Sequence, residues 1–343
     1  MSWILSVALA ASPWSSLELP PSLQRVLETG AFTGTPAGFK AIALSHLADG
    51  CRWQAMADPE RAEAAAACVQ AAFSRSLDLF PEHCAVVDGI QRCNADALLA
   101  NENPLALEHV LLVMGSADAL GPCPDEALHR RLAEGLSQQS VNDPYGIVPS
   151  YRNLSLRWPA DQSALLAALA RTDAAHGTHL AAPATERFFS IIDAQGLHAS
   201  GLPKSELTGK GPGAAYPRGC AQSFISRYLA EVDPARTAAW WTTYKKRFFV
   251  ELPFDISGFR EWPRGVTGVT DADSGPIILG IGTAASALAI SAAKAQGDSS
   301  MAHRLEVSAG RVESLGFGSS ILHATFADAI RFEGRWHPLP AAK

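Results

Sequence analysis

Charged residues are sparse in this 343-residue sequence. Asp, Glu, Lys and Arg together make up 18% of the chain, and the net charge is −6. No run of basic residues occurs, which argues against a nucleic-acid partner. The hydrophobic fraction of 48% is enough for a substantial core. Ala is abundant and β-branched alternation is rare, so an all-α fold is favoured.

Several motifs of known chemistry are also missing. The six cysteines include no Cys-x-x-Cys pair, and no group of His, Asp and Glu has metal-ligand spacing. We therefore expect no metal site. Gly209-Lys-Gly-Pro-Gly213 lacks the strand–loop–helix context of a phosphate-binding loop, and no Gly-x-Ser-x-Gly elbow of a serine hydrolase is present.

The first 20 residues form an apolar segment of signal-peptide length. They contain a cleavage-like Ala8-Leu-Ala10 pattern but lack a basic start. Two interpretations stay open: export to a periplasmic or extracellular site, or a cytoplasmic protein whose apolar arm docks on its body. Export would permit disulfides, with Cys84 and Cys93 as the nearest pair, whereas buried free thiols are the alternative. This segment is too short to span a membrane.

About a dozen helices are predicted along the chain. Asp58-Pro59 and Asp233-Pro234 each place a capping carboxylate before a proline at the first helical turn. The Gly/Ala/Ser-rich apolar stretch from Pro276 is interpreted as a packed core helix rather than a membrane span. The expected helices span residues 21–28, 37–48, 58–76, 84–99, 104–120, 124–137, 161–174, 184–194, 219–230, 234–250, 276–296, 299–314 and 319–331.

Three long loops, 142–159, 196–217 and 253–275, separate these helices. Long loops in a compact helical domain are usually functional or disordered. Paired helices with long loops on one side predict a single (α/α)6 toroid over residues 21–343, with the loops covering a central cavity; an α-solenoid is the structural alternative. The stretch 259–275 concentrates charge immediately before the apolar helix pattern, which predicts the rim of an active site.

The C-terminal third resembles a known family in the order of its motifs. Asp233-Pro234 opens an aromatic helix that ends in Phe249-Val-Glu251; Arg260-Glu261 and Asp271-Ala-Asp273-Ser-Gly275 follow, and then a small-residue helix ends at Gly297-Asp298. The same order and similar spacings occur in the linalool dehydratase-isomerase family. The resemblance implies an α/α six-fold barrel that reversibly dehydrates a tertiary terpene alcohol and isomerises an allylic one without a cofactor. It also implies a homo-oligomer, because the active site in that family can lie at a subunit interface.

The resemblance extends upstream, with departures. Glu102-Asn103 resembles the family segment that carries a catalytic histidine, which places His109 on that position. Gly146-Ile-Val148 resembles a Gly-Ile-Val that a catalytic cysteine follows directly, but Pro149 stands here. The second family cysteine falls near Asp161, and a family tyrosine falls near Cys220. Neither cysteine nor the family's N-terminal catalytic aspartate has a match, so carboxylate acid–base chemistry is the expected mechanism.

Four residues are the catalytic candidates: His109, Asp161, Asp271 and Asp273. A carboxylic acid held neutral by burial can protonate an alkene or an alcohol. The alternative for the aspartates is capping of a helix N-terminus. His109 shares a helical face with apolar residues, so it is either a site residue or a hydrogen-bonded core histidine.

Nine further residues are candidates for substrate binding. Arg260 and Glu261 could pair with each other or with the aspartates after them, joined by Arg218 and Arg264, and a structural ion-pair network is the alternative. Cys220 next to Arg218 is either a reactive or an inert buried thiol. The full set is Tyr151, Arg152, Trp158, Tyr216, Arg218, Cys220, Arg260, Glu261 and Trp262.

The favoured function is a cofactor-independent lyase or isomerase acting on a small apolar substrate, a terpenoid or an allylic alcohol. Three alternatives stay open. A protonation-initiated terpene cyclase would hold a charged head group with its arginines. A carbohydrate-active enzyme would use Glu261 and Asp273 as its paired carboxylates. A non-catalytic helical scaffold would bind a peptide or lipid.

Overall fold

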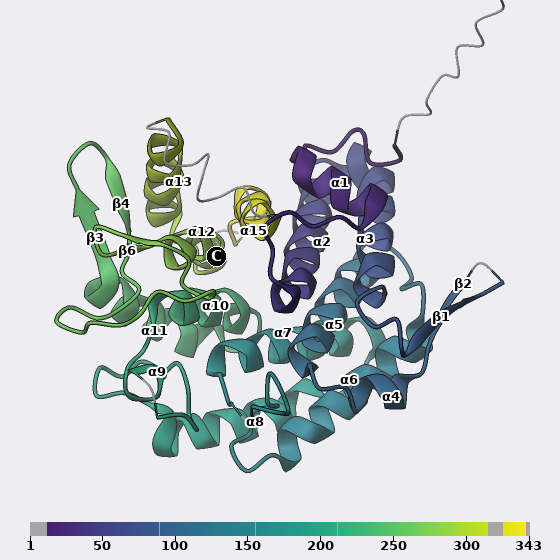
Figure 1. Ribbon diagram of the computed structural model, residues 1–343, viewed down its shortest axis with the longest axis horizontal. Helices are drawn as coiled ribbons and strands as arrows, with labels where there is room; N and C mark the ends of the chain where they lie inside the picture. Colours follow the sequence, from purple (N-terminus) through teal and green to yellow (C-terminus); the bar gives the residue numbers. More distant parts are fainter. Residues whose placement is uncertain (1–11, 89, 155, 211, 315–324, 341–343) are drawn as a thin grey trace, which may run out of the picture.

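The computed structural model describes residues 12–88, 90–154, 156–210, 212–314 and 325–340. Most of the N-terminal segment whose export was considered, residues 1–11, lies outside these ranges. The protein is mostly helical (61%), with 14 α-helices and small β-hairpins in the described part (Figure 1). None of the helices there is both long and apolar enough to cross a membrane.

Six helices form a closed cycle of packing neighbours. Each packs against the next one in the chain order given below, and the last packs against the first. Figure 1 shows their labels following one another around the middle of the molecule. The first four of these helices are buried over most of their surface, whereas the last two bury about half of their residues. They are α2 (Lys40–Ala57), α5 (Pro104–Asp118), α7 (Pro159–His176), α10 (Gly219–Tyr228), α12 (Thr283–Ala295) and α15 (Thr325–Trp336).

The remaining helices pack on the outside of this cycle or connect its members. For example, α3 contacts α2, and α6 and α8 contact α7. The longer ones, such as α3 and α6, bury one face and leave the other exposed, which is the pattern of a surface helix. They are α1 (Pro21–Thr29), α3 (Ala62–Leu77), α4 (Ala95–Leu99), α6 (Glu126–Asn142), α8 (Ala181–Ile191), α9 (Pro212–Ala215), α11 (Pro234–Phe248) and α13 (Ser299–Ser314).

The capping signals of the sequence begin helices as predicted. The Asp233 carboxylate accepts a hydrogen bond from the Arg236 amide, and Pro234 occupies the first position of α11. The Asp58 carboxylate accepts from the Glu60 amide, although one 3-10 turn, Pro59–Arg61, precedes α3. Short side chains with oxygen acceptors satisfy amides that the first helical turn leaves unpaired.

The predicted helix over residues 84–99 is wrong in its first two thirds. Cys84–Val87 (β1) and Ile90–Cys93 (β2) form an antiparallel hairpin, and only α4 is helical. Asp88 adopts a positive φ of 53°, which suits a tight turn, and a disulfide joins Cys84 to Cys93. A second disulfide joins Cys51 of α2 to Cys68 of α3. Both pairs are therefore bridged rather than free.

The helix expected to begin at Pro276 begins later. Ile277–Ile278 (β5) and Ile281–Gly282 (β6) first form a hairpin, and α12 starts at Thr283. Leu279 and Gly280 have positive φ, and β-branched residues on both sides favour strands over a helix. A third hairpin, Phe249–Leu252 (β3) with Ile256–Phe259 (β4), ends α11 just before the predicted residue 250.

Candidate active site

A cavity of about 310 Å³ opens where the N-terminal ends of several central helices meet. Leu105 lies in the first turn of α5, Asp161 in that of α7 and Cys220 in that of α10, and all three line it. Phe39 precedes α2, and Phe326 belongs to the first turn of α15. The volume is at the small end of the roughly 300–1,000 Å³ typical of ligand pockets, so a small molecule fits it best.

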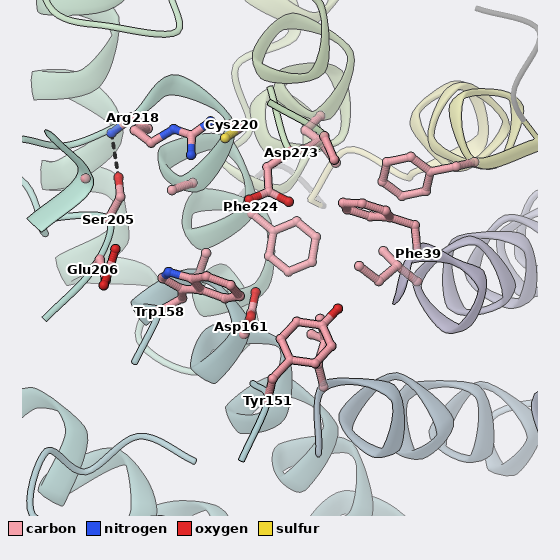
Figure 2. A pocket seen from close by; sticks show the side chains of 18 residues that line it. Phe39, Tyr151, Trp158, Asp161, Ser205, Glu206, Arg218, Cys220, Phe224 and Asp273 are labelled. Carbon is pink, nitrogen blue, oxygen red and sulfur yellow. Dashed lines mark hydrogen bonds between the residues drawn. The ribbon is translucent and has the colours of Figure 1, made fainter. Parts of the chain in front are cut away.

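Five aromatic side chains from the described segments line the cavity. Tyr151 and Trp158 meet nearly edge to face, with ring centroids 6.2 Å apart. Across the cavity, Phe39 packs against Phe326 at 5.0 Å, and Phe224 joins them (Figure 2). Such faces stabilise apolar ligands and positive charge. Gly38 is required beside Tyr151, since a Cβ atom there would come within 2.3 Å of the tyrosine hydroxyl oxygen.

Asp161 projects into this cavity from α7 between Trp158 and Tyr151 (Figure 2). The helix is capped at Trp158, so Asp161 is not the N-cap that was the alternative interpretation. Its carboxyl group accepts a hydrogen bond from the Ser150 hydroxyl. Burial raises the pKa of Asp161 to about 7, with Asp273 adding to the effect and the Ser150 bond opposing it. The group is therefore poised between its acid and base forms near neutral pH.

Asp273 enters the same space from the opposite wall, above Asp161 in the view of Figure 2. Desolvation and the neighbouring Asp271 carboxylate raise its pKa, but much of Asp273 faces solvent. Solvent screens such effects, so Asp273 stays closer to the ionised form than Asp161 does. Neither aspartate caps the following helix, because the hairpin β5–β6 separates them from α12.

Hydrogen bonds hold the Asp271 side chain outside the cavity. Its carboxylate accepts a hydrogen bond from Arg218 Nη2 at 2.7 Å and from the Ser274 amide at 2.9 Å. Burial would raise the pKa of Asp271, but these bonds outweigh it and hold the pKa below its usual range. Asp271 does not line the cavity, in contrast to Asp273.

Arg218, rather than Arg260, is the centre of the ion-pair network. Its Nε donates to Glu261 Oε1 at 2.7 Å, and its guanidinium lies over the Trp262 ring at 5.1 Å. Glu261 also accepts from the Cys220 amide and from the Cys220 thiol, each at 3.1 Å. Burial and the Glu261 carboxylate raise the pKa of the Cys220 thiol well above its usual range. The thiol is thus a protonated hydrogen-bond donor, not a nucleophile.

His109 lies behind the cavity wall. It is fully buried, with its ring 5.9 Å from Phe224, and does not line the cavity itself. Ser45 donates its hydroxyl proton to the Ile42 carbonyl, so it accepts from His109 Nδ1–H at 2.7 Å. Among the residues that the structure describes, none forms a hydrogen bond with His109 Nε2. Burial and the nearby His46 lower the pKa of His109 to about 3, so the ring is neutral.

Three candidates lie elsewhere. Arg152 lines a separate polar hollow and donates to the Leu99 carbonyl at 2.8 Å. The Tyr216 ring packs at a tilt against His198, with centroids 5.6 Å apart, and Arg260 packs on Gly280, where a Cβ atom would come within 2.8 Å of Arg260 Nη1. None of the three lines the cavity, and neither do Glu261 and Trp262, which hold Arg218 from behind.

Sequence reasoning missed several lining residues. Glu206 belongs to the long loop 196–217, and burial raises its pKa against an opposing hydrogen bond from Trp158. The length of that loop was the one available signal. The other unpredicted residues are mainly apolar, and their patterns are those of ordinary core positions: Phe39, Ile42, Leu105, Phe224, Leu288 and Phe326.

A buried ion cluster lies next to Phe224, through His46, whose ring is 6.2 Å from it. Asp49 accepts from Arg171 at 2.8 and 2.9 Å and from Arg227 at 3.0 Å, and Arg227 also donates to Glu333 at 2.8 Å. Three carboxylates and three guanidinium groups balance there, which meets the requirement that buried charges be paired. They are Asp49, Glu231, Glu333, Arg52, Arg171 and Arg227.

No known protein-family model matches this chain, and no curated protein sequence is significantly similar to it.

Proposed function

We propose that this protein is a cofactor-independent acid–base catalyst that adds water to, removes it from, or isomerises a small apolar alcohol. One observation carries the proposal: Asp161, with a pKa near 7, and the more ionised Asp273 enter an aromatic-walled cavity from opposite sides. Groups of unequal acidity around one space are the usual basis for assigning an acid and a base.

The chemistry needs only these groups. Protonated Asp161 gives its proton to the hydroxyl of an allylic alcohol, the C–O bond breaks, and water leaves. The ring faces of Trp158 and Phe224 stabilise the resulting allylic cation. Asp273 then takes a proton from the adjacent carbon, and an alkene forms. Alternatively, water adds to the other end of the allylic cation and gives a proton back to ionised Asp161, which yields the isomeric alcohol; the reverse of the dehydration gives hydration.

We further propose that the six central helices form the inner ring of an (α/α)6 toroid. Their cyclic packing supports it, as does the convergence of their N-terminal ends on the cavity. The motif order from Asp233 to Asp298 that resembles linalool dehydratase-isomerase points to the same architecture and to the same substrate class. A subunit interface near the site stays a prediction.

The alternatives have weaker support. Within the described ranges, Arg218 is the one basic residue that lines the cavity, and Glu261 and Asp271 already neutralise it. A diphosphate head group, as a cyclase substrate would present, therefore lacks an anchor. A glycosidase pair of Glu261 and Asp273 is disfavoured because Arg218 and Cys220 engage both oxygens of Glu261.

The test is product analysis with tertiary and primary allylic alcohols, their saturated analogues and the corresponding diphosphates. Asp161→Asn and Asp273→Asn should each lower kcat/KM for an allylic alcohol by roughly 10²–10⁴-fold, the usual contribution of a general acid or base. Asp96→Asn, at an exposed aspartate, is the matched control. Turnover of diphosphates alone, or full activity in both cavity variants, would contradict the proposal.

A further inference from the structure

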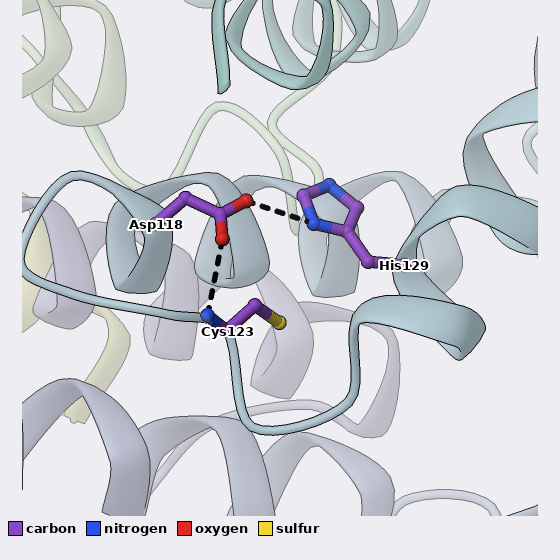
Figure 3. Close-up of side chains that lie close together, drawn as sticks. All are labelled: Asp118, Cys123 and His129. Atoms are coloured by element: carbon purple, nitrogen blue, oxygen red, sulfur yellow. Dashed lines mark hydrogen bonds and ion pairs between the residues drawn. The ribbon is translucent and has the colours of Figure 1, made fainter. Parts of the chain in front are cut away.

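A second cluster of reactive side chains lies at the opposite ends of the helices that begin at the cavity. Asp118 is the last residue of α5, and His176 is the last residue of α7. His129 comes from the first turn of α6, and Cys123 from the loop before it. Figure 3 shows the Asp118 carboxylate facing the His129 ring with one oxygen and the backbone nitrogen of Cys123 with the other. No regular metal-ligand spacing is visible in the sequence here, because His176 follows His129 by 47 positions.

The ligand atoms of these residues converge. Asp118 Oδ2 lies 3.0 Å from His129 Nδ1 and 3.0 Å from His176 Nε2, and the two nitrogens are 3.4 Å apart. The Cys123 thiol, Asp118 and His129 present ligand atoms within 4.8 Å of one another. Tetrahedral zinc with bonds of about 2.0–2.3 Å spaces its ligand atoms roughly 3.3–3.7 Å apart. His176 is not part of that group of three, so binding by all four side chains would have to bring the Cys123 sulfur and the His176 nitrogen closer together.

Hydrogen-bond accounting calls for either a proton or a metal ion between Asp118 and His129. Thr172 donates its hydroxyl proton to the Ala168 carbonyl at 2.9 Å, so it accepts from His129 Nε2–H, also at 2.9 Å. In that neutral tautomer, His129 Nδ1 carries a lone pair and faces the Asp118 carboxylate. Two acceptors at 3.0 Å repel unless a proton or a metal ion lies between them.

The surroundings complete the arrangement of a metal site. Thr172 orients His129 through a hydrogen bond to its other nitrogen, whereas Glu126 Oε1 lies 3.7 Å from His176 Nδ1, beyond hydrogen-bonding distance. The Cys123 amide donates to Asp118 Oδ1 at 3.1 Å. The C-terminal ends of α5 and α7 also favour a cation. The side chains of Asp118, His129 and His176 are 8%, 0% and 9% exposed.

We propose that Asp118, Cys123, His129 and His176 bind one Zn²⁺ ion that fastens the ends of α5, α6 and α7 together. Two nitrogens, one thiolate and one carboxylate are a ligand set that suits zinc. Four protein ligands with little solvent exposure leave no open position, which is the character of a structural rather than a catalytic site. The site is separate from the cavity and does not depend on the function proposed for it.

The experiment measures metal binding by the full-length protein, first stripped with a chelator and dialysed. It should take up one equivalent of Zn²⁺, and Co²⁺ should give a thiolate-to-cobalt charge-transfer band. Cys123→Ser should remove that band, and His129→Asn should weaken Zn²⁺ binding more than about 100-fold, beyond the 10–100-fold expected for loss of an outer-shell partner. Cys220→Ser, at the other free buried cysteine, is the matched control and should keep the band.

Circular dichroism establishes that each variant is folded before its metal content is compared. Chelation should lower the thermal unfolding midpoint of the wild type but not that of Cys123→Ser. Uptake of far less than one equivalent of Zn²⁺ by folded wild type would overturn the proposal. A cobalt–thiolate band that survives Cys123→Ser but disappears in Cys220→Ser would do the same.

Discussion

Replacing Asp161 by Asn should leave the stability of the protein nearly unchanged near pH 4 and make the protein increasingly more stable than the wild type as pH rises to about 7. The reason is the raised pKa of this carboxyl group, from the ordinary value of 3.8 to about 7 in the folded protein. Between those two values the folded state binds more protons than the unfolded state. Its stability therefore falls as pH rises through this window. Asparagine has a similar shape and no charge, so it removes that dependence.

The size of the effect follows from the two pKa values. Their difference corresponds to at most about 4 kcal/mol, at about 1.4 kcal/mol for each pKa unit. The first turn of α7 favours a negative charge by about 0.3–1 kcal/mol, and partial contact with solvent reduces the desolvation further. We expect the free energy of unfolding of Asp161→Asn to exceed that of the wild type by about 2–3 kcal/mol at pH 8.

The assay is urea unfolding, followed by tryptophan fluorescence and circular dichroism, at intervals from about pH 4 to pH 8. The difference in unfolding free energy between Asp161→Asn and the wild type should grow with pH and level off above pH 7. Asp96→Asn, whose carboxylate is exposed, should show a flat difference. A flat or falling difference for Asp161→Asn would refute the reasoning about its burial.

Two further changes test the framework that holds the site. Asp49→Asn leaves the guanidinium groups of Arg171 and Arg227 short of a buried partner, so it should lower the free energy of unfolding by about 3–5 kcal/mol in the same urea assay; a loss below about 1 kcal/mol would mean that the cluster relaxes or admits water. Replacing Cys51 and Cys68 together by Ser removes a bridge across 17 positions and should lower it by about 3 kcal/mol, whereas an equal urea midpoint with and without reductant in the wild type would show that the bridge does not form.

Local signals in the sequence predicted most helices well. The Asp233-Pro234 start and the apolar run from Pro104 each correspond to a helix within a few residues. The failures, at Cys84 and at Pro276, share one cause. In each, a turn residue with positive φ and β-branched neighbours forms a short hairpin, and residues distant in sequence or a disulfide stabilise it. Helix propensity alone does not report such tertiary influences.

The sequence predicted several of the charged and aromatic residues that line the cavity, but it did not predict which arginine pairs with the carboxylates. Asp161, Asp273, Tyr151, Trp158 and Arg218 do line the cavity. Arg260 was chosen over Arg218 as the main partner of the carboxylates because it adjoins Glu261 in sequence. Successive side chains along the strand β4 and its extension point to opposite sides, however. Arg260 and Glu261 are therefore directed away from each other although they are neighbours in sequence.

The buried ion cluster could not be predicted for a related reason. Asp49, Arg227 and Glu333 are isolated charges in three helices separated by 178 and 106 positions, and each resembles the exposed polar position of an amphipathic helix. Only the cyclic packing of the central helices brings them together. The same holds for the proposed zinc ligands, of which three come from different helices.

The buried ion cluster and the proposed catalytic carboxyl group lie at different positions along the central helices. At one end, the Asp161 carboxyl group is held where ionisation destabilises the fold, and Asn at that position would be more stable. In the middle, Asp49 pairs with buried arginines, and removal of any one of these charges would lower the stability of the fold. A structural role explains the second arrangement but not the first, because no fold requires a carboxyl group that weakens it. The unfavourable protonation equilibrium of Asp161 is therefore itself an argument that this end of the molecule is the reactive one.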